Sequence, residues 1–424
     1  MSPNEQSFYG LGIAPGILEV LDRLKFVTPT PIQAQSIPVA IEGKDLMGIA
    51  QTGTGKTLAF GIPLIQKLLQ QEGNGLIIVP TRELALQVAE SLSKIVTPLG
   101  VKVATLIGGE LIGRQIRSLA RQPRIVVGTP GRLIDHLEQK TISFRNVRVL
   151  VLDEADRMLD MGFAPQLKRI VSVVPEERQT MFFAATMPEE IVSMAKHYLK
   201  LPVRVEIARP GTTAKNVTQE VFFVSQDAKM RLLEKILGEY RGSVIVFAQM
   251  KWSVKRMTAH LRSLGQAVAE IHSNRSLAQR REALEGFRTG RYRILMATDV
   301  AARGIDVQNI ELVVNYDLPK NVEDYVHRIG RTGRAGGSGH AISFARPNER
   351  RDVQNIERLI RSTLPVSKLP ELPQAPSTPR PAFVEAHSRF ERPRRFPSRG
   401  RRPFRSGPPN RRERGFPRRR TRDY

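Results

Sequence analysis

The stretch Leu46–Thr57 reads LMGIAQTGTGKT and joins a short apolar run to a helical pattern. Its second part matches the phosphate-binding loop, except that Ala50 replaces the leading Gly. Gly53 and Gly55 allow backbone N–H groups to curl around phosphates at a helix N-terminus. Lys56 is expected to reach the β- and γ-phosphates, and the Thr57 hydroxyl to ligate Mg²⁺. The alternative is a Gly/Thr-rich turn without a ligand.

Outward from this loop, short apolar runs alternate with helical patterns. Continuous apolar runs are typical of strands that are buried on both faces of a parallel sheet. The first series is Leu76–Val79, Val101–Leu106, Ile125–Gly128, Val147–Leu152 and Met181–Ala184. The second is Val221–Val224, Val244–Phe247, Ala267–Ile271, Ile294–Ala297 and Leu312–Asn315. Helical segments such as Thr81–Ile95 and Ala278–Arg288 lie between the runs, so right-handed βαβ units are expected.

The polar stretch Ala208–Asn216, with its Pro210-Gly211 break, separates the two series and predicts a domain boundary. The sequence therefore predicts two tandem α/β domains with parallel sheets, followed by a basic tail. The expected segments are 6–34, a domain at 37–207, a linker at 208–217, a second domain at 218–366 and a tail at 367–424.

Two further motifs carry charged side chains. Asp153-Glu154-Ala155-Asp156 follows an apolar run, where Asp153 could hold Mg²⁺ through water and Glu154 could deprotonate an attacking water. The alternative is an acidic N-cap on the next helix. In His327–Arg334, Arg331 and Arg334 are spaced to share one helix face and point at one anion. The alternative is a basic surface patch.

Composition narrows the class of protein. The chain has 424 residues, a formal net charge of +25 and no cysteine. The charge indicates a polyanionic partner such as nucleic acid or an anionic membrane face. The lack of cysteine excludes a disulfide framework, a zinc ribbon and a thiol nucleophile. Without an apolar run long enough for a membrane helix or a signal peptide, we expect a soluble cytoplasmic protein.

The order and spacing of these motifs, over about residues 8–345, resemble the DEAD-box ATP-dependent RNA helicases of superfamily 2. The resemblance implies two RecA-like domains, with ATP, Mg²⁺ and RNA as ligands. It implies catalytic roles for Lys56, Asp153, Glu154, Arg331 and Arg334, with Thr57 and Asp153 at the metal. The nucleotide would contact Phe8, Phe26, Gln33, the loop residues Ala50, Gln51, Thr52, Gly53, Thr54, Gly55, Lys56 and Thr57, and Asp306.

The same resemblance assigns RNA contacts and coupling residues. RNA would contact Pro80, Thr81, Arg82, Gly108, Gly109, Thr129, Pro130, Gly131, Arg132 and Thr298. Hydrolysis would be coupled to strand separation through Asp156, Ala184, Ala185, Thr186, His327 and Arg328. Ala184 replaces the Ser that is usual in the family, and Leu277 replaces a usual Gln. The compact core and short tail look most like bacterial members of the RhlE type.

A plain RNA-binding protein would leave Glu154, Arg331 and Arg334 unexplained. Two further rival functions stay open. One is an ATP-gated RNA clamp that hydrolyses ATP with little unwinding, which the loss of the Ser hydroxyl at Ala184 would favour. The other is a DNA helicase of the same superfamily, against which the Asp-Glu-Ala-Asp tetrad and the Gln33 motif argue.

The last 49 residues, Pro376–Tyr424, contain 16 Arg, no Lys and 4 acidic residues. Such a segment cannot bury enough apolar surface to fold alone, so disorder is predicted. Because Arg pairs with phosphates and both Arg and Phe stack on bases, the tail is expected to tether RNA. The alternative is a solvated linker or solubility tail.

Overall fold

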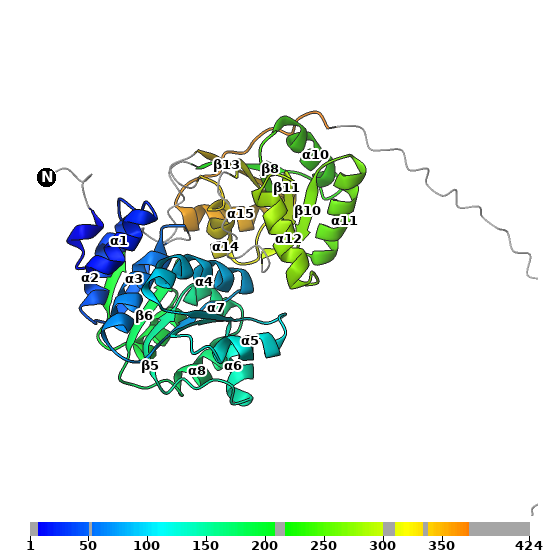
Figure 1. The fold of residues 1–424 in the computed structure, drawn as a ribbon. Coiled ribbons are helices and arrows are strands. Elements are labelled where there is room, and N and C mark those ends of the chain that lie inside the picture. Colours follow the sequence, from blue (N-terminus) through cyan, green and yellow to red (C-terminus); the bar gives the residue numbers. More distant parts are fainter. Residues whose placement is uncertain (1–6, 51–52, 208–216, 300–309, 334–337, 373–424) are drawn as a thin grey trace, which may run out of the picture. The chain divides into compact units, whose positions relative to one another are not determined.

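The protein was analysed as a computed structural model. It describes residues 7–50, 53–207, 217–299, 310–333 and 338–372. Within these ranges the chain builds two parallel β-sheets, one from each half (Figure 1).

The first sheet has seven parallel strands in the order β3-β4-β2-β5-β6-β1-β7. Its strands are β1 (Leu46–Ile49), β2 (Asn74–Ile78), β3 (Val103–Leu106), β4 (Ile125–Gly128), β5 (Val147–Leu152), β6 (Gln179–Ala184) and β7 (Val203–Glu206). Its helices are α1 (Pro15–Arg23), α2 (Pro31–Ile41), α3 (Lys56–Gln70), α4 (Arg82–Val96), α5 (Ile112–Leu119), α6 (Pro130–Glu138), α7 (Ala155–Asp160), α8 (Ala164–Val171) and α9 (Glu189–Tyr198).

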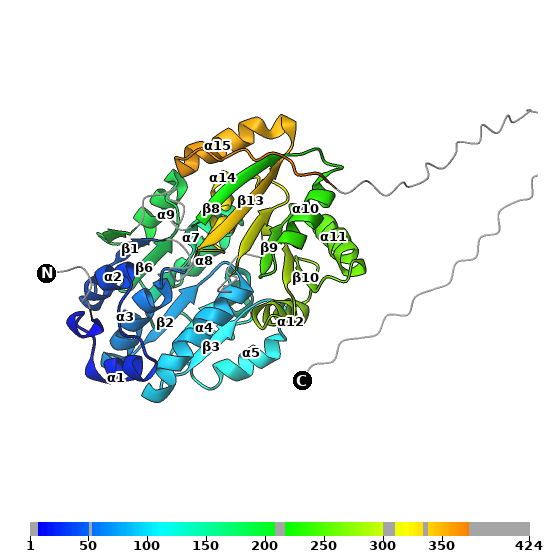
Figure 2. The same ribbon diagram turned by 90° about the horizontal axis from the view of Figure 1, so that it is seen from above.

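Alternate residues of these strands enter two separate hydrophobic cores. In β5, Val149 and Val151 face the core formed with α1 to α4, whereas Leu150 and Leu152 face the core formed with α6 to α9. This is the period-2 alternation of a strand that helices cover on both sides. Figure 2 shows α3 and α4 on one side of this sheet.

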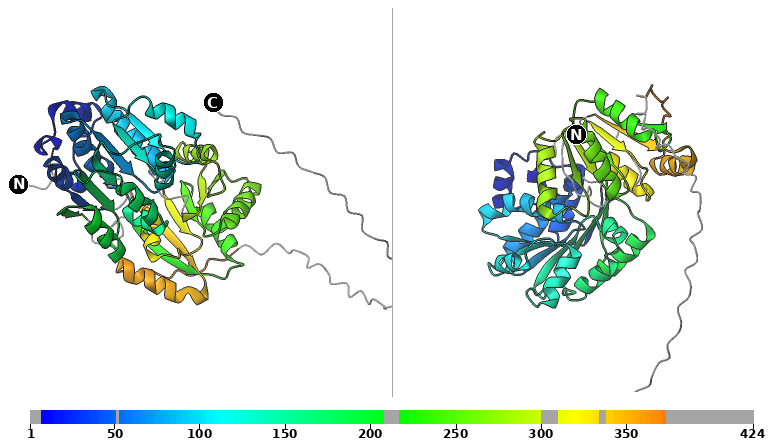
Figure 3. Two further views of the ribbon diagram at one scale, coloured as in Figure 1. Left: turned by 90° about the horizontal axis from the view of Figure 1, so that it is seen from below. Right: turned by 90° about the vertical axis from the view of Figure 1, so that its right-hand side faces the viewer.

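The second sheet has six parallel strands in the order β10-β11-β9-β12-β13-β8. They are β8 (Val217–Phe223), β9 (Val244–Phe247), β10 (Val268–Ile271), β11 (Ile294–Ala297), β12 (Leu312–Asn315) and β13 (Gly339–Ala345). Its helices are α10 (Lys229–Glu239), α11 (Lys251–Ser263), α12 (Leu277–Arg288), α14 (Val322–Ile329) and α15 (Arg350–Ile360). Again two cores form: α10 and α11 pack on one face, and α12, α14 and α15 on the other (Figure 3).

These observations confirm the predicted fold class of two parallel-sheet α/β domains. Five strands, β4, β5, β9, β11 and β12, have the bounds that the apolar runs predicted. Two strands, β7 and β13, were not predicted. The expected linker at 208–217 lies almost wholly outside the described residues. The expected tail at 367–424 lies outside them only from residue 373 on. Its predicted start is too early, because Ser367 N donates to Val221 O and Leu372 packs against the core of the second domain. In the part of the chain that the structure describes, no helix is long and apolar enough to span a membrane.

Candidate functional site

The phosphate loop follows β1 and leads directly into α3, as its sequence predicted. Gly53 and Gly55 have φ values of +85° and +90°, which an L side chain rarely adopts. These two conformations turn the chain sharply, so that α3 begins at Lys56. Thr54 and Thr57 lie in the described part of the loop, and Ala50 is buried at the end of β1, whereas Gln51 and Thr52 lie outside the described residues.

The acidic tetrad lies at the same edge of the sheet, because β5 and β1 both run parallel to β6, which lies between them. Lys56 Nζ is 3.7 Å from Asp153 Oδ1, and both side chains are about 5% exposed or less. Burial raises the pKa of Asp153 to about 6, while the charge of Lys56 opposes the rise. Among the described residues, Lys56 Nζ has no hydrogen-bond partner, so a buried cation remains with bonding capacity toward an anion.

This donor set fits a nucleotide phosphate and Mg²⁺. The buried Lys56 ammonium would neutralise phosphate charge, and the Asp153 carboxylate and Thr57 hydroxyl supply the oxygen ligands that Mg²⁺ prefers. Because Mg²⁺ keeps several waters and phosphate oxygens in such sites, two protein oxygens are sufficient.

Glu154 has an unusual backbone. Its φ of 53° and ψ of 48° place it in the left-handed region, just before α7. A non-glycine residue in this region stores strain, and such strain is concentrated at functional sites. The Glu154 side chain is 2% exposed, and Arg157 Nε lies 3.6 Å from its Oε2. The strained backbone thus holds a buried carboxylate beside the Lys56–Asp153 pair.

Asp156 connects the tetrad to the segment after β6. Its Oδ2 accepts hydrogen bonds from Ala185 N at 3.0 Å, Thr186 N at 2.9 Å and Thr186 Oγ1 at 3.1 Å. The link therefore forms without the Ser hydroxyl that Ala184 lacks. Ala184 itself is fully buried in an apolar core, where its carbonyl accepts from Ala50 N at 3.0 Å.

Gln33 contacts the phosphate loop directly. Its Oε1 accepts from Thr30 N at 2.9 Å, and its Nε2 donates to Gly55 O at 3.0 Å. An amide has two donor hydrogens and two acceptor lone pairs, so capacity for one adenine edge remains. Phe26 is 40% exposed and available for stacking, whereas Phe8 is 2% exposed and packs in the core. The assignment of Phe8 to the nucleotide stays a prediction.

The residues expected to contact RNA in the first domain gather beyond three neighbouring strands, β3, β4 and β2. Thr81 caps α4 by accepting from Leu84 N. The Arg82 guanidinium packs against Gly108 and Gly109, where a Cβ atom on Gly109 would collide with it. Arg132 donates to Glu110 O at 3.1 Å, which ties the third segment, Thr129–Arg132, to this group. Pro80 lies beside Thr81 after β2, so the predicted residues form one edge of the sheet.

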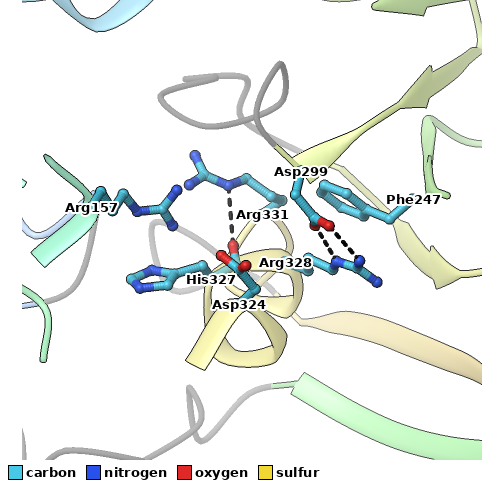
Figure 4. A pocket seen from close by; sticks show the side chains of 7 residues that line it. All are labelled: Arg157, Phe247, Asp299, Asp324, His327, Arg328 and Arg331. Carbon is cyan, nitrogen blue, oxygen red and sulfur yellow. Dashed lines mark hydrogen bonds and ion pairs between the residues drawn. The ribbon is translucent and has the colours of Figure 1, made fainter. Parts of the chain in front are cut away.

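In the second domain, Arg328 is fully engaged. Its guanidinium donates to both carboxylate oxygens of Asp299, to Asn315 Oδ1 and to Asp317 O. Figure 4 shows this pair beside Phe247, whose ring centroid lies 5.2 Å from Arg328 Cζ. Because Asp299 follows Thr298, Arg328 fixes the segment that carries the expected RNA contact. Thr298 is 9% exposed.

The prediction that Arg331 and Arg334 share one face of a helix is wrong. Helix α14 ends at Ile329 with Gly330 as its C-cap, so Arg331 lies beyond the helix. The chain leaves the helix because Thr332 pairs with Ile310 and its hydroxyl bonds Ile310 O. Arg331 is 3% exposed and donates to His327 O at 3.2 Å, and both residues line the pocket in Figure 4. Arg334 and Asp306 lie outside the described residues.

Sequence reasoning missed one charged residue and one ion pair. Arg157 is 1% exposed and lines the pocket with His327 and Arg331. Its position directly after the acidic tetrad is the sequence feature from which it could have been predicted. Glu83, 4% exposed, pairs with Arg280 Nη2 at 3.0 Å. That pairing spans nearly two hundred residues of sequence, and nothing local indicates it.

With the geometry established, comparisons with known proteins decide the family. The DEAD/DEAH box helicase family matches residues 30–194, and the helicase conserved C-terminal domain matches residues 228–336. The chain is 41% identical to a DEAD-box ATP-dependent RNA helicase CshA from Bacillus cereus, over 87% of this chain and 71% of that protein. This chain belongs to the DEAD-box ATP-dependent RNA helicases. A CshA from Bacillus subtilis is 42% identical over 87% of this chain and 75% of that protein.

Solved DEAD-box structures share the fold. Dbp5 from S. cerevisiae, bound to RNA and ADP BeF3, has a TM-score of 0.77 at 28% identity, covering 85% of this chain and 95% of Dbp5. Mss116p bound to ssRNA and AMP-PNP has a TM-score of 0.78 at 27% identity, covering 86% of this chain and 80% of Mss116p. The family matches confirm the predicted DEAD-box assignment. These relatives do not confirm the RhlE-type subgroup, which stays a prediction.

Proposed function

We propose that this DEAD-box protein couples ATP hydrolysis to local unwinding of RNA duplexes or to remodelling of RNA–protein complexes. One observation carries the proposal: the acidic tetrad contacts the phosphate loop at one end and the segment after β6 at the other. Asp153 lies beside Lys56, and Asp156 holds Ala185 and Thr186. The four consecutive residues Asp153–Asp156 would thus connect the ATP site at Lys56 to the segment Ala185–Thr186 after β6.

The first domain supplies the nucleotide chemistry. Lys56 would bind the β- and γ-phosphates, while Thr57 and Asp153 would hold Mg²⁺, in part through water. The metal supplies charge neutralisation on the phosphate oxygens. The Glu154 carboxylate would accept a proton from the attacking water. Gln33 and Phe26 would hold the adenine, and the Gln33–Gly55 hydrogen bond would report its presence to the phosphate loop.

The second domain would complete the site. Arg331 and Arg334 would neutralise charge that builds on the γ-phosphate, and Asp306 would contact the ribose. Arg328 acts through Asp299 as a positioning residue and would keep Thr298 at the RNA. Because catalysis needs residues of both domains, RNA-dependent pairing of the domains would control ATP turnover.

RNA would cross the edge formed by Thr81, Arg82, Gly108–Gly109 and Thr129–Arg132. Hydroxyls, glycines and arginines at such an edge contact phosphates, which carry no sequence information. We therefore propose binding of the RNA backbone with little sequence preference. The proposed segments are the Gln33 motif at 6–34, the ATP-binding domain at 37–207, the linker at 208–217 and the second domain at 218–366.

The Arg/Phe tail beyond residue 372 is proposed as a disordered auxiliary tether for RNA, and the cytoplasm as the place of action. The sixteen arginines of Pro376–Tyr424, without a lysine, favour contacts that combine phosphate pairing with base stacking.

Glu154→Gln tests the proposal. The amide keeps the size of the side chain but cannot accept the proton, so RNA-stimulated ATP hydrolysis should fall at least 100-fold, in line with the contribution of a general base. Binding of a fluorescent ATP analogue should persist. Glu189→Gln, at an exposed position in α9, is the matched control. Unchanged hydrolysis in Glu154→Gln would contradict the assigned base.

A further inference from the structure

Helix α11 presents an exposed face of unusual composition. Trp252, the only tryptophan of the chain, is 58% exposed on it. The guanidinium carbon of Arg256, one helical turn further on, lies 5.3 Å from the centroid of the indole ring. Lys251 and Lys255 are exposed as well, whereas Val254 and Met257 are buried. Core packing does not account for this exposed ring, because the opposite face of α11 makes the contacts with the core.

Charge on this face has one sign. The sequence from Tyr240 to Ala269 contains no Asp or Glu. Two carboxylates that contact α11 or the segment before it are paired with cations or histidine. Asp317, which accepts from Gln249 N, lies 3.2 Å from Lys229, and Glu234 contacts His260 at the other half of α11. Burial lowers the pKa of the neighbouring His272, and the positive charges of Lys251, Arg280 and Lys255 lower it further. Such a face complements a polyanion.

The sheet register places this face beside the expected RNA contact. Phe247, Ala297 and Ile271 are register partners at the ends of β9, β11 and β10. Ala248 N donates to Ala297 O at 3.0 Å, and Thr298 N to Ile271 O at 3.2 Å. The segment that enters α11 therefore runs next to Thr298. Lys251 Nζ also reaches Asn274 Oδ1 at 3.1 Å, in the segment after β10.

We propose that Trp252, oriented by Arg256, is a stacking platform for one base of the single-stranded RNA that passes Thr298, with Lys251 and Lys255 facing its phosphates. The inference rests on the proposed function and adds a base contact to a site that otherwise binds backbone. Stacking tolerates every base because each has a π-face, so the contact would strengthen binding without selecting a sequence.

The single tryptophan makes a direct test possible. The full chain, with AMP-PNP and Mg²⁺, is titrated with a ten-nucleotide oligouridylate while tryptophan fluorescence and the anisotropy of labelled RNA are followed. We expect the fluorescence to be quenched in parallel with binding. An unchanged fluorescence at saturating anisotropy would overturn the stacking contact.

Substitutions separate stacking from charge. Trp252→Ala should weaken RNA binding by about 5- to 150-fold, the range for loss of one stacked base, and Trp252→Phe should restore most of it. An abasic residue moved along the oligonucleotide should reproduce the loss at one position in the wild type and have no effect there in Trp252→Ala. Leu264→Ala, 52% exposed beyond the end of α11, is the control and should bind as the wild type does. Equal binding by wild type and Trp252→Ala would overturn the inference.

The two proposals fail in different ways. If RNA stimulates ATP hydrolysis by the wild type but Trp252→Ala binds RNA equally well, only the stacking platform is overturned. If RNA does not stimulate hydrolysis by the wild type, the proposed function is overturned together with the inference that rests on it.

Discussion

Lys56 Nζ lies 3.7 Å from Asp153 Oδ1, although the two residues are far apart in sequence, and both side chains are buried. Within the described part of the chain Lys56 Nζ makes no hydrogen bond, so the pair is held by charge. Lys56→Ala removes the cation that would face the nucleotide phosphates. We expect ATP binding to weaken by about 10- to 100-fold, because a hydrogen bond to a charged group contributes about 1.5–3 kcal/mol.

Isothermal titration with an ATP analogue measures that loss. Lys94→Ala removes an exposed lysine from α4 and is the control for net charge. Equal affinity in Lys56→Ala and Lys94→Ala would show that Lys56 does not face the phosphates.

Gly55 is the second test of the phosphate loop. Its φ is +90°, and a Cβ atom there would collide with Gln33 Nε2. Gly55→Ala should therefore strain the loop and break the Gln33–Gly55 hydrogen bond, at a cost of about 1–3 kcal/mol. The midpoint temperature of thermal unfolding and the affinity for ATP should both fall. Gly113 lies within α5, and a Cβ atom added there would have no other atom within 4 Å. Gly113→Ala is therefore the control and should leave the affinity for ATP unchanged. A Gly55→Ala protein with normal ATP affinity would be at odds with this geometry.

Arg328 tests the second domain. Lysine keeps the charge of the side chain but cannot bond both oxygens of Asp299 and also reach Asn315 and Asp317 O. Arg328→Lys should lower the free energy of unfolding by about 1.5–3 kcal/mol. Because Trp252 lies in the same domain, its fluorescence in a urea titration reports that unfolding. Arg351→Lys, at an exposed position of α15, should show no shift, and a matching midpoint for both variants would refute the structural role of Arg328.

The salt dependence of RNA binding tests the tail. If residues 376–424 contact about 5–8 phosphates, their removal should flatten the log–log salt slope by about 4–6, at about 0.7 per single-strand contact. Fluorescence anisotropy of a labelled single strand at several salt concentrations gives the slope. The same slope with and without the tail would rule out an RNA tether.

Much of the fold was predictable because its strands are continuous apolar runs. Ile125–Gly128 and Ile294–Ala297 are buried throughout, so composition alone sets their bounds. Strand β7 escaped prediction because it lies at the edge of its sheet, where Arg204 and Glu206 alternate with apolar residues. Strand β13 escaped because small and polar residues interrupt it, with Ser343 accepting a hydrogen bond from Asn315.

The site was predictable where function depends on a local motif, as at Gly53–Thr57 and Asp153–Asp156. It was not predictable where the geometry depends on contacts between distant segments. Spacing placed Arg331 and Arg334 on one helix face, but the bridge between Ile310 and Thr332 ends the helical path before Arg331. Likewise, no local pattern could show that the Gln33 amide binds Gly55 O.

Displacement of one strand from a short RNA duplex with a single-stranded extension tests the central claim most directly. The wild type should displace the strand with ATP and not with ADP. Asp156→Asn places an amide NH₂ where a carboxylate oxygen now accepts, so displacement should fall about tenfold more than ATP hydrolysis does. RNA-stimulated hydrolysis by the wild type without any strand displacement would contradict the account and favour an ATP-gated clamp.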